Sequence, residues 1–377
     1  LRVEAWRALC DVDESSASGP PLHELSPETV SQVRRDVERS LWNLLPETTK
    51  RLGLDSDGTG DVSKRARTRA KLSLKKRRES LNALILSYLR HSGSHYYQGL
   101  HDVAGVVSLV HSGCTPLALA VLLRMGQSWM SVPSREDFNP LITAVRHTIY
   151  PLLKKFDPPL HTYLTKMGVE PFFCIPWVLT FFTHSSKSLS SASRLLDVAV
   201  ASHQSFVLFM CVAAVVLERS HVMGGGQMHP DEGHAECHRR LCEVAGRIEG
   251  GGRWQEVVER AIGYIKKVPP MRIGKGKEGG TYWEDPGTWA VRGRGEAAWA
   301  RGRGGGRKVR KRNRRKMELV MDEGTKGGEG NVGGGMGETR ARIAAGNSKG
   351  NKGGTTQIAI AVAIAAVMVG AFKAFNS

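Results

Sequence analysis

The chain has 377 residues, a hydrophobic fraction of 41% and a formal net charge of +18. This apolar content supports a packed core and excludes a wholly disordered chain. The six cysteines are too sparse for a small secreted disulfide scaffold and indicate reduced thiols in a cytosol-facing protein. Much of the charge lies in residues 271–356, where 20 basic side chains stand against 9 acidic ones. The basic character therefore says little about the partners of the N-terminal part.

An early helix is marked by Ser26, Pro27 and Glu28. A hydroxyl at the N-cap, proline at the first helical position and an acid in the first turn are typical of a helix start. We expect this helix to continue along one apolar stripe. The stripe consists of Val30, Val33, Val37, Leu41 and Leu44.

The helical pattern continues through the rest of residues 1–270. A second helix is predicted through Leu74 and Leu89, ending near Gly93, which suits a left-handed cap. Later apolar segments of helix length are Leu100 to Leu123 (broken by Gly113 and Pro116), 141–167, 171–184, 190–201 and 205–219. Strand alternation bounded by tight turns is absent from this sequence pattern. We therefore predict an all-α domain over residues 1–270, with surface loops at the glycine runs 224–226 and 250–252. The first residue is Leu1 rather than Met, so the sequence leaves the start of this domain open.

The C-terminal part has a different composition. Residues 271–356 hold 23 of the 43 glycines and few large apolar residues, which predicts a disordered basic linker. An uncharged run, 358–372, follows it. Continued to Phe375, this run would form a helix of about 27 Å, which suits a thin bilayer if Lys373 reaches the headgroups. We expect residues 357–375 to form one C-terminal transmembrane helix, a tail anchor with the N-terminal domain in the cytosol.

Two short features can carry chemistry. Asp36 and Arg39 are three residues apart on the first helix and lie off its apolar stripe, so they are neighbours. Periodicity alone favours an ordinary solvated ion pair. The segment that contains Gln98 and Gly99 lies between two apolar helices, where glycine permits a tight turn that would present the amide outward. An ordinary helix junction with buried tyrosines fits the spacing equally well.

Taken together and in this order, the two features resemble the signature motifs of the TBC-domain family, whose members are GTPase-activating proteins for Rab small GTPases. The motif residues are Val33, Asp36 and Arg39, followed by Tyr97, Gln98 and Gly99. The segment from Leu1 to Leu9 around Trp6 also resembles the family's opening helix, and Trp177 to Phe182 followed by Arg194 to Asp197 resembles a later region. The resemblance covers about residues 1–270.

The resemblance implies a two-lobed all-α domain that supplies catalytic groups in trans and is not an independent enzyme. Arg39 would be an arginine finger, which in comparable systems accelerates hydrolysis about 10³–10⁵-fold. Gln98 would be a glutamine finger, Asp36 would orient Arg39, and Tyr97 and Gly99 would support the second motif. GTP and Mg²⁺ belong to the GTP-bound Rab partner, so the resemblance implies no cofactor and no metal for this chain.

Within that family the chain is similar to the subgroup anchored at the endoplasmic reticulum by its C-terminus. The similarity lies in Tyr96 to Gly99, in His101 and Asp102, and in the apolar run that ends the chain. It implies a Rab of the early secretory pathway and a place in transport from the endoplasmic reticulum to the Golgi. The mitochondrial outer membrane is the second choice, because a short span with a basic tip also suits it.

Other interpretations stay open. A non-catalytic Rab-binding scaffold would not need both Arg39 and Gln98. An RNA-binding membrane adaptor could use residues 307–316, in which eight of ten side chains are basic, but we favour anionic lipid for this block because an apolar run follows it. Nucleic acid therefore ranks below lipid as a partner. A zinc site is weighed and declined because the spacing lacks paired cysteines; its residues would be His229, His234, Cys237, His238 and Cys242.

Overall fold

The computed structural model describes residues 1–17, 19–45, 64–224 and 233–270. Within these ranges the chain forms helices joined by turns, and no strand is present. The all-α prediction is therefore confirmed for the described residues. The predicted linker (271–356) and transmembrane helix (357–375) lie outside them. In the described part, no helix combines the length and the apolar character that crossing a membrane requires.

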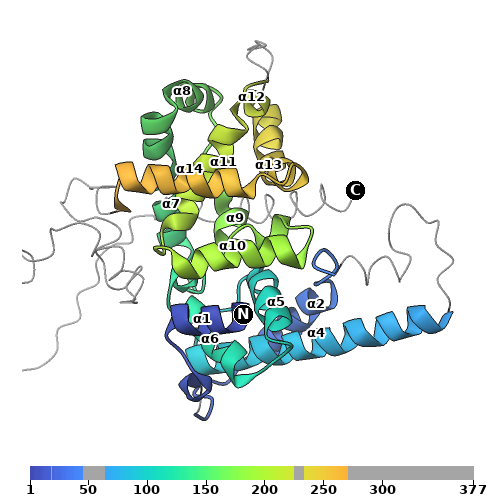
Figure 1. Cartoon of the computed structure of the whole chain (residues 1–377). Coiled ribbons are helices and arrows are strands. Elements are labelled where there is room, and N and C mark those ends of the chain that lie inside the picture. The colour runs from blue at the N-terminus through green and yellow to red at the C-terminus, as the bar shows by residue number, and fades with distance from the viewer. Residues whose placement is uncertain (18, 46–63, 225–232, 271–377) are drawn as a thin grey trace, which may run out of the picture. The chain divides into compact units, whose positions relative to one another are not determined.

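One group of helices surrounds α4, the long helix in the lower part of Figure 1. α2, α5 and α6 all pack against it, and α1 packs on α6. The members of this group are α1 (Arg2–Cys10), α2 (Pro27–Glu38), α4 (Lys64–Ser92), α5 (Leu100–Val110) and α6 (Pro116–Gly126). A short 3-10 helix, Glu14–Ala17, joins the first two and also contacts α6.

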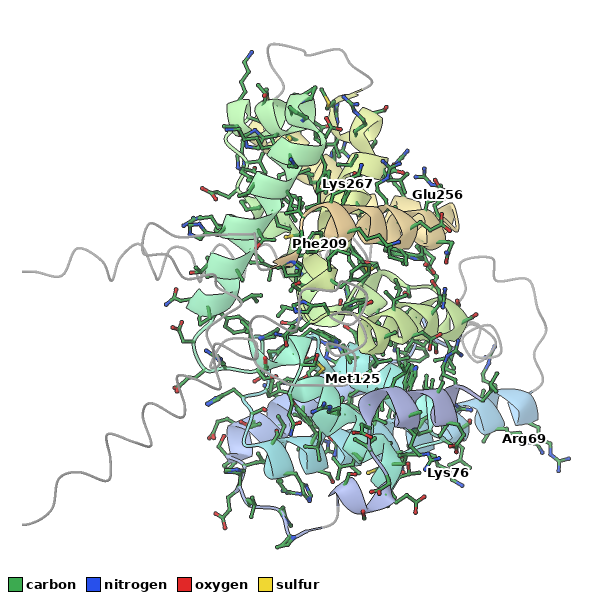
Figure 2. The ribbon with its side chains drawn as sticks, turned by 60° about the vertical axis from the view of Figure 1, so that its left-hand side comes forward. Arg69, Lys76, Met125, Phe209, Glu256 and Lys267 are labelled. Carbon is green, nitrogen blue, oxygen red and sulfur yellow. The ribbon has the colours of Figure 1, made fainter. Side chains whose placement is uncertain are left out.

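A second group is built around α11 (Phe206–Leu217), which is buried at every residue from Phe206 to Val216. A helix that is apolar on all sides belongs in a core, and α7, α13 and α14 enclose it. Figure 2 labels Phe209 in this core, and it labels Glu256 and Lys267 on the exposed face of α14. The other helices are α7 (Asn139–Phe156), α8 (Pro158–Lys166), α12 (Arg219–Val222), α13 (His234–Gly250) and α14 (Trp254–Lys267).

Two helices lie between these groups: α9 (Ile175–Thr180) and α10 (Leu189–Ala201). α9 contacts both α5 and α11, and α10 contacts α1 and α5. After α9 the chain turns sharply through Phe181 and Phe182, whose φ angles of 48° and 62° are left-handed. Both rings are buried, and their packing against Trp129, Trp177 and Trp254 offsets the cost of this backbone conformation. The turn brings the following 3-10 helix, Thr183–Ser185, against α5.

The start of α2 is as predicted, but its end is not. Ser26 Oγ accepts a hydrogen bond from the backbone N–H of Thr29 at 3.2 Å, the expected N-cap. The helix then ends at Glu38, so the predicted continuation of the stripe through Leu41 and Leu44 is wrong. Leu41 has a left-handed φ of 70°, and both leucines are buried from a turn instead of a helix. The spacing of apolar residues cannot distinguish a leucine buried from a helix from a leucine buried from a turn.

Arg78 of α4 holds this turn in place. Its guanidinium donates to the backbone carbonyl of Ser40 at 2.9 Å and lies 4.5 Å from the ring centroid of Trp42. A backbone carbonyl just beyond a helix end needs such a donor when it is part-buried. The contact fixes the C-terminal end of α2, and with it Arg39, relative to α4.

Other boundaries follow the sequence closely, with two exceptions. The predicted break at Gly113 and Pro116 is confirmed, as are the helices over 190–201 and 205–219, which are α10 and α11. The segment 141–167 is two helices, because Asp157 ends α7 and caps α8 by accepting from Leu160 N at 3.1 Å. The segment 171–184 is three short pieces.

Candidate functional site

Arg39 stands at the C-cap of α2, where the helix ends. Its side chain is 48% exposed, whereas that of Asp36 is only 6% exposed. Nη2 of Arg39 donates to Oδ1 of Asp36 at 2.5 Å, so the neighbour pair expected from the helical spacing is present. A part-buried charge-assisted bond of this kind restricts a long side chain that would otherwise sample many rotamers.

The second oxygen of Asp36 is bound by Tyr96, from the segment that precedes α5. The Tyr96 hydroxyl donates to Oδ2 of Asp36 at 2.8 Å. Burial, followed by the charge of Asp36, raises the pKa of Tyr96 well above its ordinary value, so the phenol remains a donor. This tyrosine was not among the predicted site residues. The sequence contains two adjacent tyrosines, and spacing does not tell which of them reaches Asp36.

Tyr97, the predicted support, faces the other way. Its side chain is buried, and its hydroxyl donates to the backbone carbonyl of Leu179 at 3.1 Å. Burial raises the pKa of Tyr97. Tyr97 therefore fastens the segment to α9 and does not contact the Asp36–Arg39 pair through its hydroxyl.

Gly99 begins α5 with a φ of 109°, a conformation that other residues rarely adopt. A Cβ at this position would lie 2.9 Å from Cγ2 of Thr180. The turn and the close approach of α9 both require glycine, so the structure gives a physical reason for the predicted supporting role. Gly99 thus sets the path of the backbone directly after Gln98.

Gln98 is half-buried, and in the described part of the chain its amide has no hydrogen-bond partner. A side-chain amide carries two donors and an acceptor, so this group remains available to a bound partner. The structure brings Asp36, Arg39 and Tyr96 into direct contact. Gln98 is linked to them through the chain, between Tyr96 and the turn at Gly99.

A second layer of polar groups lies behind Tyr96. Nδ1 of His101 is 3.3 Å from the Tyr96 hydroxyl and 3.9 Å from Oδ2 of Asp36. Nε2 of His101 is 3.7 Å from Oδ1 of Asp102, and Oδ2 of Asp102 is 2.9 Å from Nδ1 of His184. The chain of contacts therefore runs from Arg39 to the turn after α9.

The two outer members of this layer favour their charged forms. Burial alone would raise the pKa of Asp102, but the nearby imidazoles of His101 and His184 outweigh burial and lower it. Burial alone would lower the pKa of His184, but the Asp102 carboxylate outweighs it and raises it. Asp102 and His184 thus form an ion pair that anchors the second layer. Sequence reasoning noted His101 and Asp102 only as part of a family resemblance, and His184 carried no signal because it is 82 residues from its partner.

The zinc site that the sequence analysis declined is not formed in the described residues. No group of three or more His, Cys, Asp or Glu there could share a metal ion. Cys242 Sγ lies 3.7 Å from His238 Nδ1, and His229 falls outside the description.

The chain matches a known protein family over more than half of its length. The Rab-GTPase-TBC domain family matches residues 1–223, and the chain belongs to this family. It is 27% identical over 199 residues to "GTPase-activating protein gyp10" of Schizosaccharomyces pombe, covering 52% of this chain and 50% of that protein. It is 22% identical over 281 residues to human "TBC1 domain family member 20", covering 73% of this chain and 61% of that protein.

The chain thus spans between 50% and 61% of the length of these two relatives. The solved TBC domain of a flagellar RabGAP from Chlamydomonas is 12% identical, with a TM-score of 0.42 over 69% of this chain and 78% of that one.

The Asp102–His184 pair predicts a pH-dependent stability. Because folding raises the pKa of His184 above its ordinary value of 6.5, its contribution is fully present below that pH and is lost as pH rises through the folded value. We expect His184→Gln to lower the free energy of unfolding by about 1–3 kcal/mol at pH 6 and by clearly less at pH 8.5. Urea unfolding at both pH values measures this. His95→Gln, at an exposed site, is the matched control, and an equal loss at both pH values would show that the pair is not ionic.

Proposed function

We propose that this chain accelerates GTP hydrolysis by a Rab small GTPase, with Arg39 as the arginine finger and Gln98 as the glutamine finger. The observation that carries the proposal is the half-exposed guanidinium of Arg39, held at 2.5 Å by a buried carboxylate that Tyr96 also binds. A surface arginine without a functional role would not need a buried carboxylate that is itself hydrogen-bonded through both oxygens.

The proposed chemistry uses groups that are already in place. Negative charge develops on the phosphoryl oxygens in the transition state, and a preorganised guanidinium stabilises it at little reorganisation cost. A guanidinium has five N–H groups, so one arginine side chain can bind a carboxylate and also donate to the phosphoryl oxygens of a partner.

Gln98 complements this role. Its amide can donate to the γ-phosphate and accept from the attacking water, which positions the nucleophile. The glycine turn at Gly99 and the anchor at Tyr97 restrict the backbone on its C-terminal and N-terminal sides. GTP and Mg²⁺ would come with the Rab partner, so the chain itself needs neither to act.

The family and the relatives support this reading over the rivals. The fission yeast relative is named as a GTPase-activating protein. A non-catalytic scaffold has no use for the Asp36–Arg39–Tyr96 arrangement. The RNA-adaptor alternative depends on residues 307–316, which lie outside the described residues.

The membrane part of the proposal rests on the sequence. We place the chain at the endoplasmic reticulum, anchored through the apolar run within 357–375, with 307–316 near anionic lipid and a Rab of the early secretory pathway as the partner. The resemblance of the chain to the anchored subgroup supports this placement.

Deleting residues 357–377 tests the anchor. The truncated protein should leave the membrane fraction and keep its rate toward a soluble Rab, because the proposed fingers lie in the N-terminal domain. Fractionation before and after a high-salt wash is the measurement, since salt removes contacts made only by the basic block. Retention after the wash would place the anchor elsewhere in the chain.

The two-finger mechanism is tested with Gln98→Ala and a Rab whose own catalytic glutamine is replaced by leucine. If Gln98 positions the water, the altered Rab still responds to the native protein, because its own glutamine is spare. Gln98→Ala should lower the single-turnover rate on the native Rab at least about 10-fold and abolish the response of the altered Rab. The Rab is first chosen by screening a panel.

Two controls keep this result interpretable. Arg34→Ala changes an exposed arginine on the opposite side of α2 and should leave the rate unchanged. Melting temperatures should be equal, because a half-buried amide without a partner contributes little to stability. Insensitivity of the altered Rab to the native protein, or an early melt of Gln98→Ala, would remove the support for the glutamine finger.

A further inference from the structure

The N-terminal half of α4 carries charge of a single sign. Residues 64–78 contain nine Lys and Arg and no Asp or Glu. The tail is not the only concentration of positive charge in the chain, and this one lies on an ordered helix of 29 residues. In Figure 1 its N-terminal end extends past the helices that pack on the rest of α4.

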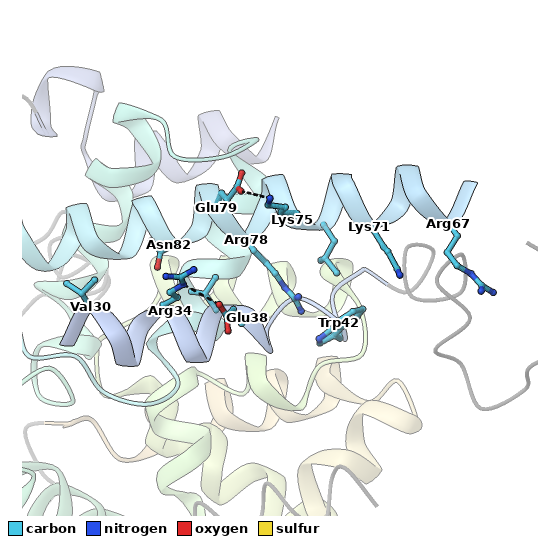
Figure 3. Close-up of a pocket in the computed structure, with 12 residues that line it drawn as sticks. Val30, Arg34, Glu38, Trp42, Arg67, Lys71, Lys75, Arg78, Glu79 and Asn82 are labelled. Atoms are coloured by element: carbon cyan, nitrogen blue, oxygen red, sulfur yellow. Dashed lines mark hydrogen bonds and ion pairs between the residues drawn. The ribbon is translucent and has the colours of Figure 1, made fainter. Parts of the chain in front are cut away.

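These cations form two rows along the helix. Arg67, Lys71 and Lys75 follow each other at four-residue steps and line a pocket of about 820 Å³ between α2 and α4, with Arg34 across from them (Figure 3). The second row is Arg65, Arg69, Leu72 and Lys76, at steps of four, three and four, which places these four residues on one face. All four are exposed, Leu72 at 53%. Figure 2 labels Arg69 and Lys76 at the surface. We call this second row the α4 basic face.

The α4 basic face is electrostatically unfavourable for the helix itself. Cations in the first turns of a helix oppose its dipole, and like charges four residues apart, such as Arg65 and Arg69, destabilise it. Among the described residues, no acidic side chain pairs with Arg65, Arg69 or Lys76. Arg78 differs, because it binds the carbonyl of Ser40 and packs on Trp42. A costly arrangement of unpaired cations points to an external anionic partner.

The pocket between α2 and α4 and the proposed catalytic residue Arg39 lie on opposite sides of α2. Arg34 and Glu38 face the pocket with α4. Asp36, which holds Arg39, is two residues from each of them and therefore about 160° around the helix. A Rab bound at Arg39 would leave the cations of α4 uncovered.

We propose that the α4 basic face binds the surface of a bilayer that contains acidic phospholipid. A bilayer with acidic lipid attracts any dense cluster of cations. A folded protein partner would need a pattern of both charges to fix its orientation, and this row contains no acidic residue. Leu72 adds an exposed apolar side chain among the cations, the pattern of a segment that lies in a membrane interface. The proposal does not depend on the catalytic roles of Arg39 and Gln98.

A probe at position 72 of the full chain tests this contact directly, whatever other segments do at a membrane. Leu72→Cys is labelled with an environment-sensitive fluorophore in a Cys114→Ser background, because Cys114 is the exposed native thiol. Phosphatidylcholine vesicles with phosphatidylserine should shift its emission to the blue, and pure phosphatidylcholine vesicles should not. A label at Ile262→Cys on α14, 39% exposed in the native chain, should not respond. High salt should remove the shift.

Charge variants complete the test. Arg65→Gln, Arg69→Gln and Lys76→Gln together should raise the vesicle concentration for half-maximal shift at least about 10-fold. The matched control is Lys155→Gln, Lys166→Gln and Lys267→Gln, three exposed cations on other helices, which should leave it unchanged. The first triple variant should melt no lower than the native protein, because repulsion is relieved, and should keep its rate toward a soluble Rab.

Three outcomes would overturn the proposal. The first is no emission shift with phosphatidylserine vesicles. The second is an equal loss of response in both triple variants. The third is a shift with RNA but none with vesicles, which would assign the α4 basic face to nucleic acid.

Discussion

The buried carboxylate of Asp36 is the constraint on which the candidate site depends. One oxygen binds Arg39 and the other binds Tyr96, so a single side chain joins the end of α2 to the segment before α5. A carboxylate that is 6% exposed is costly unless its charge and lone pairs are satisfied. Losing either partner would leave a buried carboxylate unsatisfied, so both contacts are favoured. The contact with Asp36 therefore restricts the otherwise flexible side chain of Arg39.

The rest of the structure positions these three residues. Arg78 fixes the turn after α2, Tyr97 and Gly99 fix the segment that carries Gln98, and the Asp102–His184 pair closes the layer behind Tyr96. The supports come from α4, α9 and the turn that follows α9. The proposed fingers are therefore held by contacts from the surrounding helices, which suits groups that must be in place when charge develops on a partner.

The features that could be predicted from the sequence are those set by residues close together in the chain. The cap at Ser26, the break at Gly113 and the pairing of Asp36 with Arg39 depend on residues a few positions apart, and the structure contains all three. The end of α2 was missed because Leu41 is buried from a left-handed turn, which leaves the apolar stripe unbroken. Tyr96 was missed because its neighbour Tyr97 is chemically identical and only the tertiary fold separates them.

Long-range contacts could not be predicted either, because only the tertiary fold brings their residues together. His184 meets Asp102 across 82 residues, and a single sequence gives no signal for such a pair. The charge of α4 was visible in the sequence, but its meaning was not. Only the fold shows that one row of cations lies against α2 and that the residues of the other row are exposed.

The central claim is that Asp36 acts through Arg39, and a double-mutant cycle on the single-turnover rate tests it most directly. Asp36→Asn keeps the shape of the side chain but removes the charge that holds the guanidinium, and Arg39→Ala removes the guanidinium itself. Residues that act as one unit show strongly non-additive losses. We expect Arg39→Ala to lower the rate at least about 10²-fold, and the double variant to be no more than about threefold slower than Arg39→Ala alone. Losses that multiply, in proteins that stay folded and bind the GTP-loaded Rab with native affinity, would contradict the account.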